Sequence, residues 1–395
     1  MAEKDFVVIA GIARTPQGNL LGALKDVSST QLGTTVIKAV IERAKLMPSD
    51  IQEVIMGCVL PAGLGQAPAR QAAIGAGVPA STPCTTLNKV CGSGMKAVMF
   101  AHDAIKLGHH NIMIAGGMES MTNAPYLIPK ARQGYRIGKG EILDHMMCDG
   151  LEDAYEQGKP MGLFAEACAS TYQFSRAEQD KFATTSLTRA KLASDEKCFA
   201  AEITPVIIKT RQGEQIIDTD EHPSSVKLEK ISQLPAAFMK DGTITAASSS
   251  SIADGAAALV LMSETEADKR GIKPLARIIG HTSFAKLPSE FTTAPIDAIR
   301  NLLKQINWTV ATVDLFEINE AFAVVTMAAM RDLAIPHEKI NIHGGGCALG
   351  HPIGATGARI IVTLVAALQK YKLKRGIASL CIGGGEATAI AIEMI

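Results

Sequence analysis

The sequence predicts an α/β protein built from two similar halves, with a long insertion in the first half. Patterns typical of short buried strands alternate with helical patterns along most of the 395 residues, which favours parallel strands that are largely buried beneath helices. Segments 93–98 and 356–361 share one pattern, a Ser or Thr followed by glycine and an apolar helix face. Cysteine and glycine also cluster in both parts of the chain, at 91–94 and 381–385. Such self-similarity indicates the duplication of one unit.

The first half begins with an apolar strand pattern at 6–10, and a second follows at 54–56. A glycine corner at 91–94 then leads into a helix, for which Ser93 is expected to be the N-cap. Apolar residues recur along this helix at helical spacing: Met95, Val98, Met99 and Ile105. An apolar strand at 111–115, followed by glycine, completes the unit.

The segment 122–243 has a different character. It gathers Gly, Pro, Met, Lys and Asp with weak periodicity, apart from one helix pattern at 177–194. Long insertions of this kind commonly carry ligand contacts. The apolar run 254–262 is expected to return to the first sheet. We therefore expect three parts: an N-terminal half (1–121 and 244–272), a loop insertion (122–243) and a C-terminal half (273–395).

The second half repeats the order of the first, starting with a strand pattern at 274–279. Segment 313–318 matches 52–57. The helix starts at 93 and 356 match with an offset of 263 residues, and the glycines at 116 and 383 match with an offset of 267. A loop insertion between them would explain the change in offset.

Composition and charge exclude several classes of protein. Lysine plus arginine equals aspartate plus glutamate, at 39 each, so the chain lacks the positive excess of a nucleic-acid-binding protein. The first residues resemble neither a secretory signal nor a transit peptide. Apolar runs such as 321–330 are expected to fall short of the ~18 residues of a membrane helix. The eight scattered cysteines favour free thiols in a reducing cytoplasm.

Two cysteines at glycine corners are the main candidates for chemistry. Cys91 precedes a predicted helix, whose unpaired N–H groups and dipole favour the thiolate, so we expect a pKa below the ordinary value of about 8.5. The alternative for Cys91 is a small buried core residue. Cys381 could be a redox partner, a structural residue or a base, although the chain has no Cys-x-x-Cys spacing. Backbone N–H groups near Gly383 could bind an oxyanion.

Two polar residues accompany these cysteines. His351 lies in a segment with six glycines, 344–357, which lacks the Gly-Lys-Ser/Thr ending of a phosphate-binding loop. His343 and Cys347 precede it at intervals of four residues, but the glycines and a proline oppose a helix there, so we expect no metal site. Asn319 lies at a predicted strand-to-helix turn, where it could act in catalysis or as an N-cap.

Taken together, these motifs resemble the thiolase family. The matching segments are NKVCGSG at 88–94, GGMESM at 116–121, NEAF at 319–322, GHPIG at 350–354 and CIGGG at 381–385. The resemblance extends from residue 8 to the C-terminus. It implies the thiolase fold, in which duplicated α/β halves form a five-layered α-β-α-β-α core with an inserted loop domain. It also implies a homodimer or, more often, a homotetramer that is a dimer of dimers.

The resemblance implies the reversible condensation of two acetyl-CoA to acetoacetyl-CoA and CoA, without any cofactor besides these CoA thioesters. Cys91 would be the nucleophile, with His351 taking its proton. Cys381 would then take a proton from the second acetyl-CoA. The N–H groups of Cys91 and Gly383 would bind the oxyanion of the acyl-enzyme step, and His351 with a water held by Asn319 would stabilise the enolate.

The resemblance also implies contacts with coenzyme A. Ser250 would contact the pantetheine arm, and Lys230 or Lys227 would approach the phosphates. The apolar lining positions would be Ala246, Met161 and Phe322.

Three departures from the family pattern concern acyl-chain preference. Segment 159–162 reads KPMG, whereas acetoacetyl-CoA thiolases have histidine before Met-Gly. Segment 248–251 reads SSSS, and the last motif continues with Glu386-Ala387. A proline before Met-Gly is common in longer-chain 3-ketoacyl-CoA thiolases, so a broad-range degradative thiolase is the alternative. A noncatalytic acyl-CoA- or lipid-binding relative is another, and it would be expected to lack a catalytic residue.

Overall fold

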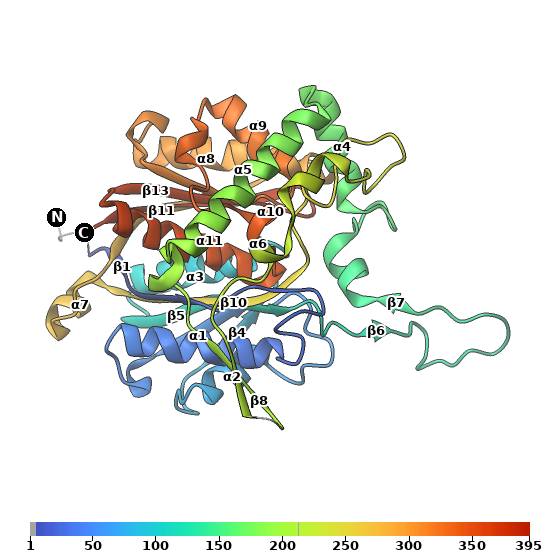
Figure 1. The fold of residues 1–395 in the computed structure, drawn as a ribbon. Coiled ribbons are helices and arrows are strands. Elements are labelled where there is room, and N and C mark those ends of the chain that lie inside the picture. The colour runs from blue at the N-terminus through green and yellow to red at the C-terminus, as the bar shows by residue number, and fades with distance from the viewer. Residues whose placement is uncertain (1–4, 212) are drawn as a thin grey trace.

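The computed structural model describes residues 5–211 and 213–395 and has five stacked layers (Figure 1). Helices α1 (Ser29–Arg43) and α2 (Pro68–Gly75) form one outer layer, and α8 (Ala294–Ile306) and α9 (Ala323–Leu333) form the other. Helices α3 (Ser93–Lys106) and α11 (Ile353–Tyr371) lie between the two sheets. The predicted α-β-α-β-α core is confirmed.

The two sheets have the same strand order. The first sheet runs β1 (Val7–Arg14), β10 (Ala253–Ser263), β5 (Ile112–Ser120), β3 (Glu53–Gly57) and β4 (Cys84–Leu87), and β2 (Gly18–Asn19) also pairs with β10. The second runs β11 (Ala276–Ala285), β14 (Glu386–Met394), β13 (Arg375–Ile382) and β12 (Leu315–Ile318). Antiparallel pairing of β1 with β11 joins the sheets. The expectation of parallel strands is correct only for β3 with β4 and β5 and for β12 with β13, because the other pairs are antiparallel. The strand order β11-β14-β13-β12 thus repeats β1-β10-β5-β3.

Three buried apolar clusters correspond to the three interfaces between helices and sheets. Strand β10 shows how one strand contributes to two of these clusters, because its side chains alternate between the two faces of the sheet. Leu259 and Leu261 pack in the central cluster with α3 and α11, whereas Val260 and Met262 pack in the cluster with α1. The third cluster lies between the second sheet and helices α8 and α9. Strands buried on both faces explain the continuous apolar runs in the sequence.

One of the sequence matches between the halves is wrong. The match of Ser93 with Thr356 agrees with the structure, because both lie in the first turn of a central helix. However, Gly116 lies inside β5, whereas Gly383 lies in the turn after β13. Strands β5 and β13 occupy the same place in the sheet order, so the glycines of the two segments do not correspond.

The central helices α3 and α11 approach each other at two glycines. A Cβ atom added to Gly94 would lie 2.7 Å from the backbone N of Ala358, and one added to Gly357 would lie 2.4 Å from the backbone N of Met95. The two contacts are symmetric, because Gly94 and Met95 correspond to Gly357 and Ala358 in the repeat. Only glycine allows so close a backbone approach. It brings the first turns of both helices to one place between the halves.

Helix α11 corrects one sequence-based expectation. It has 19 residues and a mean hydropathy of 1.3, so it is long and apolar enough to cross a membrane. The expectation that apolar segments stay well short of that length was wrong. In the structure 89% of this apolar window is buried, because the helix packs between the two sheets. This position explains its composition.

The segment between β5 and β10 contains more structure than was predicted. Helix α5 (Arg176–Asp195) confirms the pattern at 177–194, whereas α4 (Met161–Tyr172) was not predicted because its few polar residues leave little periodicity. Strands β8 (Val206–Thr210) and β9 (Gly213–Ile217) form a hairpin. A longer hairpin starts at β6 (Tyr126–Leu127) and β7 (Leu143–Asp144) and projects from the body (Figure 1). The short helix α6 (His222–Ser225) also lies in this segment. Two other short helices, α7 (Glu264–Arg270) and α10 (Gly346–Leu349), lie outside it.

Candidate active site

Cys91 lies on a strained turn between β4 and α3. Val90 has a φ of 46°, in the left-handed region that is unfavourable for a β-branched residue. Ser93 fixes this turn, because its Oγ accepts a hydrogen bond from Lys89 N at 2.8 Å and donates one to Val90 O at 2.7 Å. The N-cap of α3 is Gly92, so the prediction that Ser93 caps the helix is wrong. Its side chain instead holds the loop that presents the thiol.

His351 lies just before α11, and a hydroxyl group fixes its ring. Its Nδ1 lies 2.6 Å from Oγ1 of Thr356, and that hydroxyl donates its one proton to Pro352 O at 3.0 Å. The hydroxyl therefore accepts a hydrogen bond from Nδ1–H, and Nε2 carries the free lone pair. Burial lowers the pKa of His351 to about 3, and the positive charge of Arg359 contributes. At neutral pH the ring is thus a neutral base with Nε2 available.

The start of α11 is held against the first sheet by Glu119 of β5. Its buried carboxylate accepts hydrogen bonds from Val59 N at 2.8 Å, Leu60 N at 3.1 Å and Gly354 N at 2.9 Å. Beside it, a Cβ atom added to Gly117 would lie 2.0 Å from Gly354 O. These contacts fix the turn that carries the histidine relative to the N-terminal half.

The end of β13 and the turn after it bring Cys381 and Gly383 to the cavity that Cys91 also lines. Hydrogen bonding from the backbone N–H groups of Gly383 and of Cys91 itself favours the Cys91 thiolate and so lowers its pKa. Burial, together with the charge of Cys91, raises the pKa of Cys381 well above its ordinary value. The two glycine corners are 290 positions apart in sequence, and the fold joins them at one place.

The environment of Cys91 corrects the prediction of a lowered pKa. Burial raises the pKa of Cys91 to about 11, and the two backbone hydrogen bonds only partly offset this. Desolvation of the thiolate outweighs the favourable helix terminus. Cys91 is therefore a thiol at neutral pH, and it needs a base to become a nucleophile.

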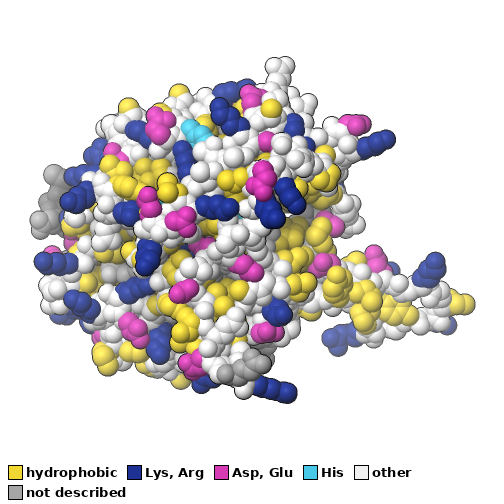
Figure 2. Space-filling model, viewed as in Figure 1, with side chains coloured by type: hydrophobic (Ala, Val, Ile, Leu, Met, Phe, Trp, Pro, Cys, Tyr) yellow, Lys and Arg dark blue, Asp and Glu magenta, His cyan; other side chains and the backbone are white. Residues whose placement is uncertain are grey.

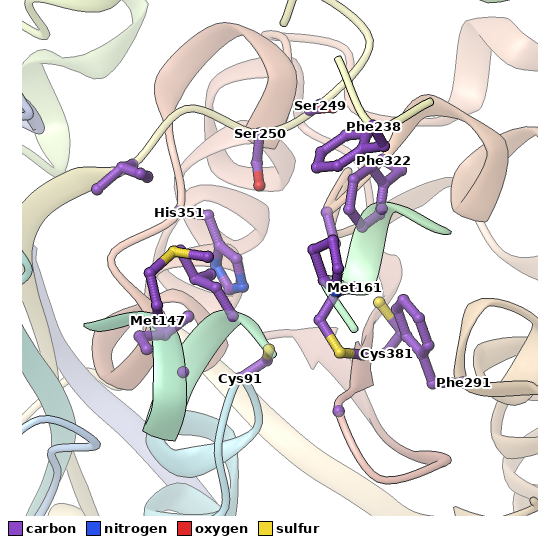
Figure 3. A pocket seen from close by; sticks show the side chains of 18 residues that line it. Cys91, Met147, Met161, Phe238, Ser249, Ser250, Phe291, Phe322, His351 and Cys381 are labelled. Carbon is purple, nitrogen blue, oxygen red and sulfur yellow. The ribbon is translucent and has the colours of Figure 1, made fainter. Parts of the chain in front are cut away.

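Cys91, His351 and Cys381 face one cavity of about 260 Å³ (Figure 3). The walls are mostly apolar, and the hydroxyl of Ser250 points into the space. The lining residues predicted from sequence are Cys91, His351, Cys381, Gly383, Ser250, Met161 and Phe322. The others include Phe238, Phe291, Met147, Leu151, Pro160 and Ile353. A thiol, a neutral imidazole and a second thiol around an apolar cavity suit acyl transfer through a covalent intermediate.

Comparison with known proteins identifies the family. The models of the thiolase N-terminal domain and the thiolase C-terminal domain match residues 7–265 and 272–394. The chain belongs to the thiolase family. The first of these models takes in the loop insertion as well as the N-terminal half.

The similarity to individual thiolases covers almost the whole chain. The acetyl-CoA acetyltransferase of Schizosaccharomyces pombe is 46% identical over 391 residues, which are 98% of this chain and 99% of that protein. The cytosolic acetyl-CoA acetyltransferase of Mus musculus is 46% identical over 395 residues, with 99% of each covered. Among solved structures, the Bacillus anthracis acetyl-CoA acetyltransferase has a TM-score of 0.97 at 40% identity and covers both chains fully. A thiolase from Ascaris suum in complex with coenzyme A has a TM-score of 0.93 at 41% identity, covering 99% of this chain and 100% of that one.

Three of the predicted site residues do not line the cavity. Asn319 is buried, and its backbone N donates to Ser379 O at 3.0 Å. Among the described residues no group bonds to its side-chain amide. It is not an N-cap, because α9 begins after Phe322. Ala246 and Lys230 are exposed and lie outside the cavity lining.

The possible zinc ligands of the glycine-rich segment have separate partners in this thiolase. Nε2 of His343 lies 3.1 Å from the Tyr371 hydroxyl, and Sγ of Cys347 donates to Glu320 O at 3.6 Å. His351 faces the active-site cavity instead. These three side chains therefore do not share a ligand position.

Sequence reasoning missed several residues that shape the site. Thr356 and Glu119 lie within quoted segments. The available signals were a hydroxyl near an otherwise apolar helix start for Thr356 and a carboxylate inside an otherwise apolar strand for Glu119. Phe238 comes from an irregular segment and Phe291 from the 3-10 segment Pro288–Thr293, both far from the motifs. No local pattern marks such residues, because only tertiary packing brings them to the cavity.

Proposed function

We propose that this thiolase is an acetyl-CoA C-acetyltransferase, which condenses two acetyl-CoA to acetoacetyl-CoA and CoA and also catalyses the reverse reaction. The observation that carries the proposal is the placement of Cys91, His351 and Cys381 around one cavity. The printed names of the S. pombe and mouse relatives support the choice of acetyl-CoA. A noncatalytic binding protein would have no use for two thiols and a base at one place.

The first half-reaction forms an acyl-enzyme. The Cys91 sulfur attacks the thioester carbon of acetyl-CoA while its proton passes to Nε2 of His351. The N–H groups of Cys91 and Gly383, which favour a negative charge on this sulfur, bind the oxyanion. The carbon–sulfur bond to CoA then breaks, and the CoA thiolate takes the proton of Cys381.

The second half-reaction forms the carbon–carbon bond. The Cys381 thiolate takes a proton from the methyl group of a second acetyl-CoA, and the resulting carbanion attacks the acyl carbon on Cys91. The enolate oxygen is stabilised by the His351 imidazolium, and by a water that the unbonded amide of Asn319 holds. Release of acetoacetyl-CoA leaves a Cys91 thiolate, which recovers its proton from His351. All groups then return to their starting states.

The electrostatics of the two cysteines favour this order of steps. A negative charge on Cys91 raises the pKa of Cys381. Cys91 carries that charge only while it is activated for attack, and acylation removes it before Cys381 has to ionise. The Cys381 thiolate of the second step therefore meets no repulsion from Cys91. The protein supplies every acid and base of the scheme, so we propose that no resident cofactor is needed.

Mass spectrometry of two variants tests these roles. Cys91→Ala should take up no acetyl group from acetyl-CoA. Cys381→Ala should still be acetylated on Cys91, while condensation is slowed by orders of magnitude. An acetyl group found on Cys381 and never on Cys91 would reverse the two roles. Wild-type turnover by Cys91→Ala would end the covalent proposal.

A preference for longer acyl chains is the alternative, because Pro160 lines the cavity at the position where the family pattern has histidine. Proline offers no polar contact to a short acyl group, and the surrounding walls are apolar. The alternative is a broad-range degradative 3-ketoacyl-CoA thiolase. Turnover of acetoacetyl-CoA should exceed that of 3-ketooctanoyl-CoA if the narrow assignment is right. A strong preference for 3-ketooctanoyl-CoA would contradict the assignment as an acetyl-CoA C-acetyltransferase and support the broad-range thiolase.

We also propose that the chain forms a homotetramer, as a dimer of dimers, and that it acts in the cytoplasm. Strand β4 is a sheet edge that pairs only with β3 among the described strands, and a second copy could extend it. The β6–β7 hairpin carries apolar side chains into solvent (Figure 2), such as Ile137 at 98% and Ile142 at 65% exposure. Both surfaces suit self-association. A single-chain mass in light scattering would contradict the assembly.

We further propose that Lys230, or Lys227, binds the phosphates of the CoA nucleotide. Lys230 is exposed within the 3-10 segment Leu228–Gln233, next to Lys227. Both ammonium groups are free to meet phosphates at the surface. Lys230→Ala should raise the KM for CoA in thiolysis and leave kcat unchanged, and an unchanged KM would remove this residue from the site.

A further inference from the structure

A cluster of three potential metal ligands lies away from the active site, where the two halves meet. His102 and Asp103 belong to α3, and His281 belongs to β11. Oδ1 of Asp103 lies 3.0 Å from Nδ1 of His102 and 2.9 Å from Nε2 of His281. The two ring nitrogens lie 3.2 Å apart. Three ligand atoms from two distant segments thus converge on one point.

We propose that this cluster binds one divalent transition-metal ion, such as Zn²⁺, which ties the central helix α3 to the second sheet. Bonds of about 2.0–2.2 Å to nitrogen and oxygen place neighbouring ligand atoms roughly 2.9–3.5 Å apart in octahedral or tetrahedral sites. The separations in the cluster, 2.9 to 3.2 Å, fall in that range. Two imidazoles and one carboxylate form a zinc ligand set that leaves a position open for water.

The orientation and exposure of the side chains also suit a metal ion. The planes of the two imidazole rings are at 89°, so their nitrogens converge without the rings stacking. Side-chain exposures of 14% for His102, 49% for Asp103 and 15% for His281 give an ion access from solvent.

The alternative is a cluster held by hydrogen bonds alone. If both rings donate to Asp103, two N–H groups face each other across 3.2 Å, and if only one ring donates, the bare nitrogen of the other ring faces the carboxylate oxygen. A metal ion removes both conflicts, because all three atoms become ligands and the proton of each ring moves to its other nitrogen, Nε2 of His102 and Nδ1 of His281. The ammonium group of Lys106, a neighbouring cation on α3, donates to the backbone carbonyl of Asp5, so it does not take the place of the metal ion.

Metal binding to matched variants of the full-length protein tests the proposal. Free thiols also bind zinc, so each variant is compared with the wild type by equilibrium dialysis with Zn²⁺, alongside thermal unfolding with and without the ion. His281→Asn should bind one ion fewer per chain and lose the zinc-induced rise in Tm. Asp103→Asn, at a half-exposed position that tolerates substitution, should weaken binding by about tenfold or more. His109→Asn, an exposed histidine outside the cluster, should behave like the wild type.

Two outcomes would overturn the proposal. If the wild type and His281→Asn bind the same number of ions with the same affinity, the cluster is held by hydrogen bonds only. If the ion binds but raises the Tm equally in all variants, the stabilisation comes from another site, such as the thiols. A selective loss of both effects in the two cluster variants supports the site.

Discussion

Replacing Gly357 with alanine should push the two central helices apart. The added Cβ atom would lie 2.4 Å from the backbone N of Met95, about 1 Å closer than an ordinary contact of roughly 3.5 Å. A backbone atom cannot rotate away, so α11 must move. Overpacking of this kind costs about 1–3 kcal/mol, and the higher helix propensity of alanine returns about 0.5–1 kcal/mol of that.

The same displacement should lower the rate. Cys91 lies just before α3 and His351 just before α11, so a shift of about 1 Å between the helices misaligns nucleophile and base and should reduce kcat about 10²-fold. Urea unfolding gives the stability change, and thiolysis of acetoacetyl-CoA gives the rate.

Gly33→Ala in α1 is the matched control. Its Cβ atom would meet Met118 Sδ at 2.4 Å and Ala72 Cβ at 3.0 Å. Neither atom belongs to a turn that carries a catalytic residue, so kcat should be retained even if stability falls. Wild-type stability and kcat in Gly357→Ala would refute the view that backbone contact at this crossing sets the site.

Three further predictions follow from the same geometry. Thr356→Val removes the hydroxyl that accepts Nδ1–H of His351, so kcat for thiolysis should fall by about 10–100-fold, within the contribution of a general base; Thr356→Ser should recover it. Because the pKa of His351 is about 3 in the folded chain and about 6.5 when unfolded, the unfolded state binds more protons between these values, and stability falls as pH decreases through this window. Urea unfolding of His351→Asn should lack this component, which amounts to at most about 1.4 kcal/mol per pH unit; an identical pH profile would contradict the depressed pKa. The Lys89–Glu386 pair, with Nζ and Oε2 at 2.5 Å, is partly exposed, so Glu386→Gln should cost no more than about 1 kcal/mol in urea unfolding, and a larger loss would mean that the pair locks the two catalytic turns.

Much of the fold was predictable because it depends on local periodicity. Strands buried on both faces produce uninterrupted apolar runs, such as 254–262, and helix α3 keeps its apolar residues at helical spacing. The repeat was visible through the helix starts at Ser93 and Thr356. The glycine match at 116 and 383 failed because glycine is used for different reasons at the two places. A Cβ atom added to Gly116 would lie 2.2 Å from Ala257 O of the neighbouring strand β10, whereas Gly383 lies in a turn.

The sequence by itself determined which residue types carry the chemistry, because each motif is a short segment whose residues act together. Only the tertiary structure decided where those segments meet and how they ionise. Folding brings the backbone N–H of Gly383 close to Cys91. Burial then raises the pKa of that thiol, whereas the helix terminus alone would lower it. The convergence of His102 with His281, 179 residues away, likewise has no local signal. Contacts and desolvation depend on the whole packed chain, and a linear pattern contains neither.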